Sequence, residues 1–338
     1  MTTSAPTVTL RDGNTMPQLG LGVWEAGRGE PTYRAVRDAL ELGYRHIDTA
    51  KIYGNEKDVG RAVRDSGVPR EAIFVTTKLW NADQGYDTAK RAFEASFRAL
   101  DLGYIDLYLV HFPERKRVES FRALIELKES GQVRSIGVSN FTGRHLDELV
   151  EATGVTPSVN QIELHPFLQQ RDITAACVRH GVAVEAYSPL ARGRRMDHPV
   201  VARLAQETGR TPAQVLLRWA VEKGWVVIPK SVRRERIEEN GRIFDFRLSA
   251  DQQGALDALD EDYRRGVGQR LTARGRRAAG RCSSSRRGCG RATGSGAPGR
   301  GRPRSTRRGA RAGAWRPPSR PRGTRRPGCS PARRPPRR

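Results

Sequence analysis

Cysteine is scarce in this chain and is poorly placed for its two structural uses. The 338 residues contain four cysteines, and only Cys177 lies in the first 263. The other three lie at 282, 289 and 329, with no CxxC spacing and no accompanying group of histidines. The pattern argues against a disulfide framework and against a zinc site, and we expect no metal.

Apolar segments long enough to cross a bilayer are also absent, since none approaches the ~20 residues that a membrane helix needs. Residues 1–10 have neither the basic nor the apolar region of a signal peptide. We therefore expect a cytoplasmic protein with no membrane contact.

Lysine, aspartate and glutamate are missing from residues 264–338, which hold 25 of the 61 Lys and Arg residues, all of them arginine. The first 263 residues keep 36 Lys and Arg against 37 Asp and Glu, a net charge of −1, although the whole chain carries +24. The sequence thus predicts a near-neutral body, 1–263, and a disordered, basic, low-complexity tail, 264–338, that cannot bury a core.

Three interpretations of this tail stay open. Its arginines could bind nucleic acid or another anionic surface, or the tail could be solvated and without a role. We favour a frameshift artefact, because Arg, Gly, Pro and Ala all have GC-rich codons and because Lys, which the body uses, is absent. Translation of the other reading frames beyond codon 263 tests the artefact interpretation, which fails if no frame encodes a family-like terminal loop. We expect no nucleic-acid binding except through this tail.

The body alternates short apolar strands with amphipathic helices after an N-terminal hairpin over 7–17, where Asp12-Gly13 predicts the turn. The predicted strands are 19–23, 46–48, 73–78, 105–111, 135–138, 158–163, 183–187 and 225–228. The predicted helices are 32–42, 56–66, 87–100, 119–130, 144–153, 171–180, 199–223, 233–241 and 249–259.

Eight such units in about 230 residues predict an α/β fold, a closed (β/α)8 TIM barrel with a parallel sheet covered on its outside. A doubly wound open sheet is the alternative. Against it, the segment Leu19–Trp24 contains only two of the three glycines of a dinucleotide-binding loop and opens no helix.

Four polar side chains fall at or near predicted strand ends: Asp48, Tyr53, Lys78 and His111. A free phenol has a pKa near ~10, too high for easy proton donation, and we expect the Lys78 ammonium to lower the pKa of Tyr53 while Asp48 aims the ammonium. A neutral His111 would hydrogen-bond a substrate oxygen. Singly, a Lys–Asp pair is more often a solvated ion pair and a strand-end His a satisfied polar group. Together the four predict protonation of a carbonyl oxygen while hydride arrives at carbon.

Other strand ends predict where a cofactor and a substrate bind. A phosphate could bind at the end of the eighth strand and on the following helix, to Lys230, Ser231 and Arg236. Taken alone, this segment is equally well interpreted as an ordinary solvated helix. Side chains that could hold a flat ring and its carboxamide are Ser139, Asn140, Gln161 and Tyr187, although position alone favours barrel core for Tyr187. A substrate pocket could be walled by Trp24, Trp80 and, more weakly, Phe112.

Three segments carry a family resemblance: Gly43–Gly60, Arg134–Phe141 and Ile228–Asn240. In length and order they resemble the three signatures of the aldo-keto reductase family. The resemblance covers roughly residues 6–263 and is nearest to bacterial 2,5-diketo-D-gluconate reductase-like members.

The resemblance implies a monomeric (β/α)8 enzyme that reduces small polar aldehydes and ketones, diketo-gluconate or 2-oxoaldehydes among them, with NADPH. It makes Tyr53 the proton donor, tuned by Asp48 and Lys78, with His111 orienting the carbonyl. Ser139, Asn140 and Gln161 would hold the nicotinamide carboxamide, with Tyr187 stacked on the ring. The rest of NADPH would contact Ser188 and Leu190 (pyrophosphate), Lys230, Ser231 and Arg236 (2′-phosphate), and Glu239 and Asn240 (adenine).

Two departures from the family pattern concern the substrate mouth. Phe112 stands where members often have Trp, and the segment 113–118 is short. Residues 259–263 resemble the lead-in to a loop that usually covers the substrate, but the arginine-rich tail follows. Alternatives to the enzyme are a nicotinamide-binding sensor or partner subunit on the same barrel, or a nucleic-acid binder acting through the tail.

Overall fold

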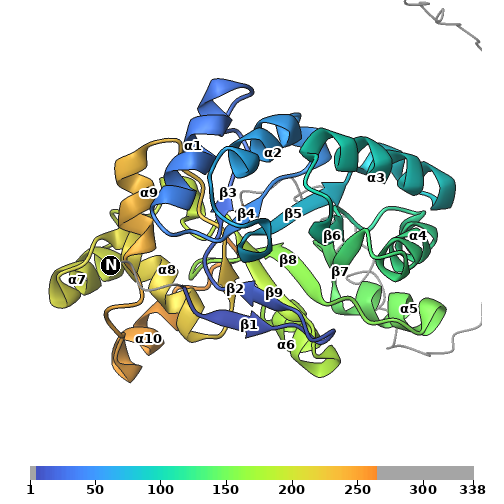
Figure 1. Ribbon diagram of the computed structural model, residues 1–338. Coiled ribbons are helices and arrows are strands. Elements are labelled where there is room, and N and C mark those ends of the chain that lie inside the picture. Colours follow the sequence, from blue (N-terminus) through green and yellow to red (C-terminus); the bar gives the residue numbers. More distant parts are fainter. Residues whose placement is uncertain (1–4, 265–338) are drawn as a thin grey trace, which may run out of the picture. The chain divides into compact units, whose positions relative to one another are not determined.

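The structure is a computed structural model, and it describes residues 5–264. Eight parallel strands pair in chain order (Figure 1). The first and last of them also meet, because the amides of Gly20 and Gly22 donate to the carbonyls of Val227 and Pro229 over 2.9 and 3.1 Å. The predicted (β/α)8 fold is confirmed. Its strands are β3 Leu21–Gly22, β4 His46–Asp48, β5 Phe74–Leu79, β6 Ile105–Val110, β7 Val133–Ser139, β8 Val159–Glu163, β9 Ala183–Tyr187 and β10 Val226–Val227.

Helices follow the strands and lie outside the sheet (Figure 1). Strands β5 and β6 are buried at every position, because one face points into the barrel and the other meets a helix. This double burial explains their continuous apolar sequence. The helices are α1 Glu30–Glu41, α2 Glu56–Arg64, α3 Tyr86–Leu100, α4 Arg117–Glu129, α5 Gly143–Thr153, α6 Arg171–His180, α7 Pro199–Thr208, α8 Pro212–Glu222, α9 Arg234–Gly241 and α10 Ala250–Asp257.

The single helix predicted over 199–223 is wrong, since the structure has two helices there, α7 and α8. Gly209 ends α7 in the left-handed region at φ +61°, where glycine carries no steric penalty. The Thr211 hydroxyl then accepts the amide of Gln214 over 3.3 Å, and Pro212 is the first residue of α8. A Gly followed by a Thr–Pro cap signals a helix break, which the continuous apolar periodicity concealed.

The predicted hairpin is present as β1 Thr7–Thr9 and β2 Thr15–Pro17. The Asp12 carboxylate in its turn accepts hydrogen bonds from Lys128 and Ser158, both over 2.9 Å, and the Asn14 amide donates to Ser135 over 2.9 Å. These partners lie around the starts of β7 and β8, so the hairpin covers the amino-terminal end of the barrel. The opposite end is left for a site.

The two glycines of the first strand have a packing role. A Cβ atom on Gly20 would lie 2.5 Å from the His46 ring, and one on Gly22 would lie 2.9 Å from the carbonyl oxygen of Ile228. Any larger residue would push apart the strands that close the barrel. This close approach accounts for the Gly-x-Gly pattern without a nucleotide.

The predicted body ends where the described residues end. Within residues 5–264, no helix is long and apolar enough to span a bilayer, and no group of His, Cys, Asp or Glu is arranged to hold a metal ion. The disorder and the nucleic-acid role predicted for 264–338 lie outside the described residues, apart from Arg264. The domain boundary therefore stays a prediction.

Candidate active site

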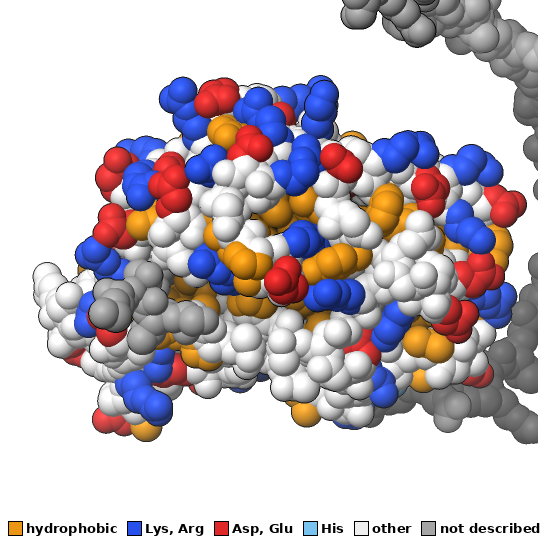
Figure 2. All heavy atoms as spheres, viewed as in Figure 1, with side chains coloured by type: hydrophobic (Ala, Val, Ile, Leu, Met, Phe, Trp, Pro, Cys, Tyr) orange, Lys and Arg blue, Asp and Glu red, His pale blue; other side chains and the backbone are white. Residues whose placement is uncertain are grey.

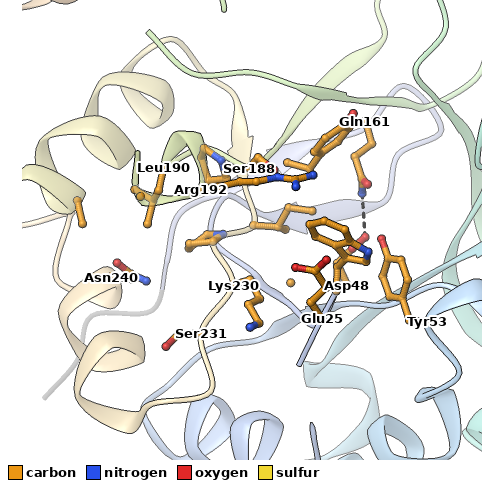
Figure 3. A pocket seen from close by; sticks show the side chains of 18 of the residues that line it. Glu25, Asp48, Tyr53, Gln161, Ser188, Leu190, Arg192, Lys230, Ser231 and Asn240 are labelled. Carbon is orange, nitrogen blue, oxygen red and sulfur yellow. Dashed lines mark hydrogen bonds between the residues drawn. The ribbon is translucent and has the colours of Figure 1, made fainter. Parts of the chain in front are cut away.

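The carboxyl ends of the strands surround a cavity of about 890 Å³ (Figure 3). All the residues predicted to bind cofactor or substrate line it, and so do Asp48 and Tyr53. The only predicted site residue outside the lining is Lys78, which is fully buried. The structure thus gathers side chains from the carboxyl-terminal parts of all eight strands, or from the segments just after them, and from α9 around one space.

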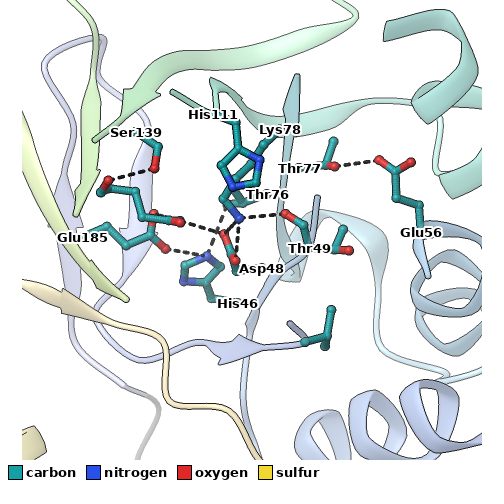
Figure 4. A network of polar contacts seen from close by, with 12 residues as sticks. His46, Asp48, Thr49, Glu56, Thr76, Thr77, Lys78, His111, Ser139 and Glu185 are labelled. Atoms are coloured by element: carbon teal, nitrogen blue, oxygen red, sulfur yellow. Dashed lines mark hydrogen bonds and ion pairs between the residues drawn. The ribbon is translucent and has the colours of Figure 1, made fainter. Parts of the chain in front are cut away.

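Lys78 and Asp48 form a buried ion pair beside this cavity (Figure 4). The Lys78 Nζ lies 2.6 and 2.7 Å from the two carboxylate oxygens and 2.8 Å from the carbonyl of Thr49. Their side chains are 0% and 3% exposed, so the solvated-pair alternative is wrong. Because desolvation offsets most of the attraction in a buried pair, stability alone does not explain this one, and a role in a site is favoured.

Tyr53 ends a single 3-10 turn, Lys51–Tyr53, after β4. Its ring centroid is 5.3 Å from the Lys78 Nζ, so the phenol and the ammonium are neighbours as predicted. The predicted direction of the pKa shift is not seen. Burial raises the pKa of Tyr53 well above its ordinary value, and the charge of Asp48, with that of Glu185 wherever Glu185 is ionised, raises it further. The ammonium already pairs with Asp48, so its effect on the phenol is offset, and the phenol keeps its proton.

His111 follows β6 and faces Tyr53 edge-on, with 6.1 Å between the ring centroids. Burial, and then the charge of Lys78, hold the pKa of His111 well below its ordinary value, so the imidazole is neutral, as expected. Trp80 meets the imidazole edge-on at 5.3 Å, and Phe112 stacks on it at 5.2 Å. The predicted substrate wall therefore also fixes the ring that would orient a carbonyl.

The sequence analysis missed a second carboxylate, Glu185, in this cluster. The Gln161 side-chain amide donates to Asp48 over 2.8 Å and to Glu185 over 2.9 Å. His46 lies 3.5 Å from the other Glu185 oxygen and 3.3 Å from the Thr76 hydroxyl. A charged residue in the middle of the apolar strand 183–187 was a signal that could have found it.

The groups predicted to hold a carboxamide are joined to one another. Tyr187 donates its hydroxyl hydrogen to the Asn140 side-chain oxygen over 2.9 Å, and the Asn140 amide donates to Ser139 over 2.9 Å. Asn140 has φ +63°, which aims it at the cavity. Tyr187 is half-buried and lines the cavity, so the barrel-core alternative is not what the structure shows.

The far end of the cavity is cationic. It is lined by Lys230, Ser231 and Arg236. Within residues 5–264, neither cation forms an ion pair or a side-chain hydrogen bond. On the same helix, by contrast, the Arg234 guanidinium lies 2.6 Å from Asp38 and 2.9 Å from Glu41. Arg236 is exposed as well, so it differs from Arg234 in lining the cavity and in having no carboxylate partner within residues 5–264, and not in its contact with solvent.

Glu25 and Arg192 also line the cavity and were not predicted (Figure 3). The Arg192 guanidinium lies 4.4 Å from the centroid of the Trp24 ring, a cation–π geometry. Arg192 has φ +55° in a short irregular segment after β9. Neither residue stands at a strand end, so the position rule that identified the other site residues did not apply to either.

Comparison with known proteins gives consistent results. The family model described as "Aldo/keto reductase family" matches residues 18–261. An aldo-keto reductase of Mycolicibacterium smegmatis is 51% identical over 265 residues, covering 78% of this chain and 96% of that protein. A methylglyoxal reductase DkgA of Yersinia pestis is 49% identical over 263 residues, covering 76% and 94%.

Solved structures agree with this match. An aldo-keto reductase of Bombyx mori, solved in complex with NADP, superposes with a TM-score of 0.74 at 36% identity and covers 79% of this chain and 96% of that one. The match to the family model takes in most of the described residues and every predicted site residue. The chain belongs to the aldo/keto reductase family.

Proposed function

We propose that this protein reduces small polar aldehydes and ketones to alcohols with NADPH, and that Tyr53 donates the proton. The observation that carries the proposal is the buried Lys78–Asp48 pair beside Tyr53, with a neutral His111 facing the phenol. Relatives named as a methylglyoxal reductase and as a 9,11-endoperoxide prostaglandin H2 reductase of Trypanosoma cruzi support a reductive reaction.

The donor set along the cavity fits NADPH. Within residues 5–264, the cations of Lys230 and Arg236 have no carboxylate partner. Together with the Ser231 hydroxyl they suit the 2′-phosphate that distinguishes NADPH from NADH. At the other end, Tyr187 offers a ring face and Ser139, Asn140 and Gln161 offer polar groups for a carboxamide. Ser188, Leu190, Glu239 and Asn240 belong to the same lining and would contact the rest of the cofactor. When bound, NADPH supplies the hydride.

The protein's own part in the reaction follows from the charges around the phenol. Tyr53 would transfer its proton to the carbonyl oxygen as negative charge develops there, and the Lys78 ammonium would stabilise the phenolate that results. Neutral His111 would donate a hydrogen bond to the same oxygen. Trp24, Trp80 and Phe112 would exclude water from the reacting carbon, and the aromatic wall favours small substrates such as 2-oxoaldehydes.

A spectrophotometric screen tests the proposal. The full chain is incubated with methylglyoxal and other small carbonyl compounds, and oxidation of NADPH and of NADH is followed separately. We expect turnover that is faster with NADPH at low cofactor concentration. Tight NADPH binding without turnover of any carbonyl compound would contradict the proposal that the protein is an enzyme and would favour the sensor interpretation.

A further inference from the structure

Glu185 is a fully buried carboxylic acid at the centre of the barrel. It lies in the middle of β9, where its register partners are Gln161 on β8 and Val226 on β10. It does not line the cavity, so it does not touch a substrate there. An inward acidic residue of this kind costs folding free energy unless it is neutralised or paired, and it has no Lys or Arg partner of its own among the ion pairs of residues 5–264.

The Gln161 side chain links Glu185 to the proton-donating cluster. A primary amide has two N–H donors, and both are used here, one on Asp48 at 2.8 Å and one on Glu185 at 2.9 Å. The link fixes which way the amide faces, because a turned amide would place its oxygen against two carboxyl groups. Only the Gln161 oxygen is then left to accept a hydrogen from a cofactor carboxamide.

The buried charges around Glu185 balance only if one of the two carboxyl groups holds a proton. Lys78 supplies one positive charge, and both carboxylate oxygens that contact its ammonium belong to Asp48. Burial lowers the pKa of His46 to about 3, so His46 is neutral. Burial and the Asp48 charge raise the pKa of Glu185 to about 8. With Glu185 protonated, Lys78 and Asp48 balance; with Glu185 ionised, the cluster would hold an uncompensated buried charge.

We propose that Glu185 is a positioning residue of the reductase site: as a neutral carboxylic acid it accepts one Gln161 N–H and thereby directs the other onto Asp48. The Glu185 oxygen that carries the proton would then be the one that faces the His46 ring nitrogen at 3.5 Å. Its effect on the phenol is indirect, since it keeps a second negative charge away from Tyr53 and leaves Lys78 paired with Asp48 alone.

The titratable and polar groups that face Glu185 come from several elements packed around β9. Strand β4 presents His46 and Asp48, β5 presents Lys78 and the Thr76 hydroxyl, and β8 presents Gln161. Tyr53 reaches the cluster from the turn after β4, and its pKa responds to Glu185. The β10 partner is Val226, which cannot titrate. Among residues 5–264, Lys78 is the Lys or Arg whose charge acts on Glu185.

The first test measures the protonation state and needs no turnover. Between pH 4.5 and pH 8 the native state would hold a proton on Glu185 that the unfolded state has released, so raising the pH through this range lowers stability. Glu185→Gln, a neutral isostere, removes that contribution. We expect the thermal midpoint of the full wild-type chain to fall by several degrees relative to the variant between pH 5 and pH 8.5. If the thermal midpoints of the wild type and the variant change in parallel with pH, Glu185 is not protonated in the native state and the inference is overturned.

The second test measures positioning, and this part of the inference depends on the proposed function. Glu185→Gln can still accept the Gln161 hydrogen, so we expect its kcat for methylglyoxal with NADPH to stay near the wild-type value at pH 7. Glu185→Leu cannot accept that hydrogen. Its kcat should fall about tenfold while its KM for NADPH stays within about threefold of the wild-type value. An equal loss in both variants, or unchanged kcat in both, would overturn positioning.

The two tests separate the possible failures. If Glu185→Leu does not fold, the pH dependence of Glu185→Gln and its near-normal kcat still decide the inference. If the wild type turns over no carbonyl, the proposed function fails, positioning for that reaction fails with it, and the pH arm alone decides whether Glu185 is neutral.

Discussion

The Tyr53 phenol is surrounded by opposing electrostatic influences. Burial and the Asp48 charge raise its pKa, as does the charge of Glu185 wherever that group is ionised, whereas the Lys78 ammonium, 5.3 Å from the ring, favours the phenolate. A high resting pKa keeps the proton on the phenol until a substrate oxygen develops negative charge. The shift predicted from the sequence rests on the ammonium alone and has the wrong direction, because the burial of a side chain is not visible in a sequence.

At the phosphate end, Arg236 and Arg234 make a matched pair on one helix. Arg236→Ala removes an unpaired cation from the cavity, and charge-assisted contacts of this kind contribute about 1.5–3 kcal/mol. We expect the Kd for NADPH to rise about 10- to 150-fold, with little change for NADH. The measurement is fluorescence titration of each cofactor.

Arg234→Ala is the control, since the Arg234 guanidinium pairs with Asp38 and Glu41. It should leave the ratio of the two dissociation constants unchanged. Equal losses of NADPH and NADH affinity in Arg236→Ala would remove the 2′-phosphate assignment.

Individual site residues were predictable where a rule connects sequence position with place. Asp48, Lys78 and His111 stand at strand ends, and the carboxyl ends of parallel strands meet at one face. Glu25 and Arg192 lie on irregular segments, so no rule of position applied to them. Glu185 needed the inference that a charged residue inside a buried strand must find a partner.

The elements were predicted well in type and less well in extent. Strands β3 and β10 are only two residues long, because they close the barrel through isolated backbone contacts at Gly22 and Lys230. Helices α7 and α8 were merged in the prediction, because apolar periodicity continues across Gly209. Local cap chemistry, rather than periodicity, determines where those helices end.

Two helical glycines give a prediction about packing. A Cβ atom on Gly60 in α2 would lie 1.9 Å from the Leu100 carbonyl oxygen at the end of α3, whereas one on Gly254 in α10 meets nothing within 4 Å. Gly60→Ala should destabilise the protein by about 1–3 kcal/mol or more through overpacking. Gly254→Ala should stabilise it by up to about 1 kcal/mol, because alanine has the higher helix propensity.

Thermal unfolding followed by circular dichroism compares the two variants with the wild type. Midpoints that move in opposite directions support the close approach of α2 to α3. A Gly60→Ala midpoint equal to that of Gly254→Ala would contradict it.

Considered as a whole, the molecule combines a near-neutral body with a basic tail. Figure 2 shows positive and negative side chains interspersed on the visible face of the body. The family match ends at residue 261, close to the point where composition changes. Both the barrel and the site lie on the body side of that point, which is why a sequence argument based on strand ends could reach them.

A truncation after Arg264 tests this division. It retains the described ion pair of Arg264 with Asp262 and removes 24 of the 25 tail arginines. We expect the full chain to shift DNA in a gel with an affinity that falls steeply as salt rises, and the truncated chain to give no shift. Its NADPH affinity should match that of the full chain. DNA binding by the truncated chain would contradict the charge argument.

The most direct measurement is a comparison of kcat and NADPH affinity in Tyr53→Phe. The substitution removes the hydroxyl and keeps the ring beside Lys78 and His111. The account predicts that kcat for carbonyl reduction falls about 10²- to 10⁴-fold, while the Kd for NADPH stays within about threefold. A variant that keeps its turnover, or that loses turnover only because NADPH no longer binds, would contradict the assignment of Tyr53 as the proton donor.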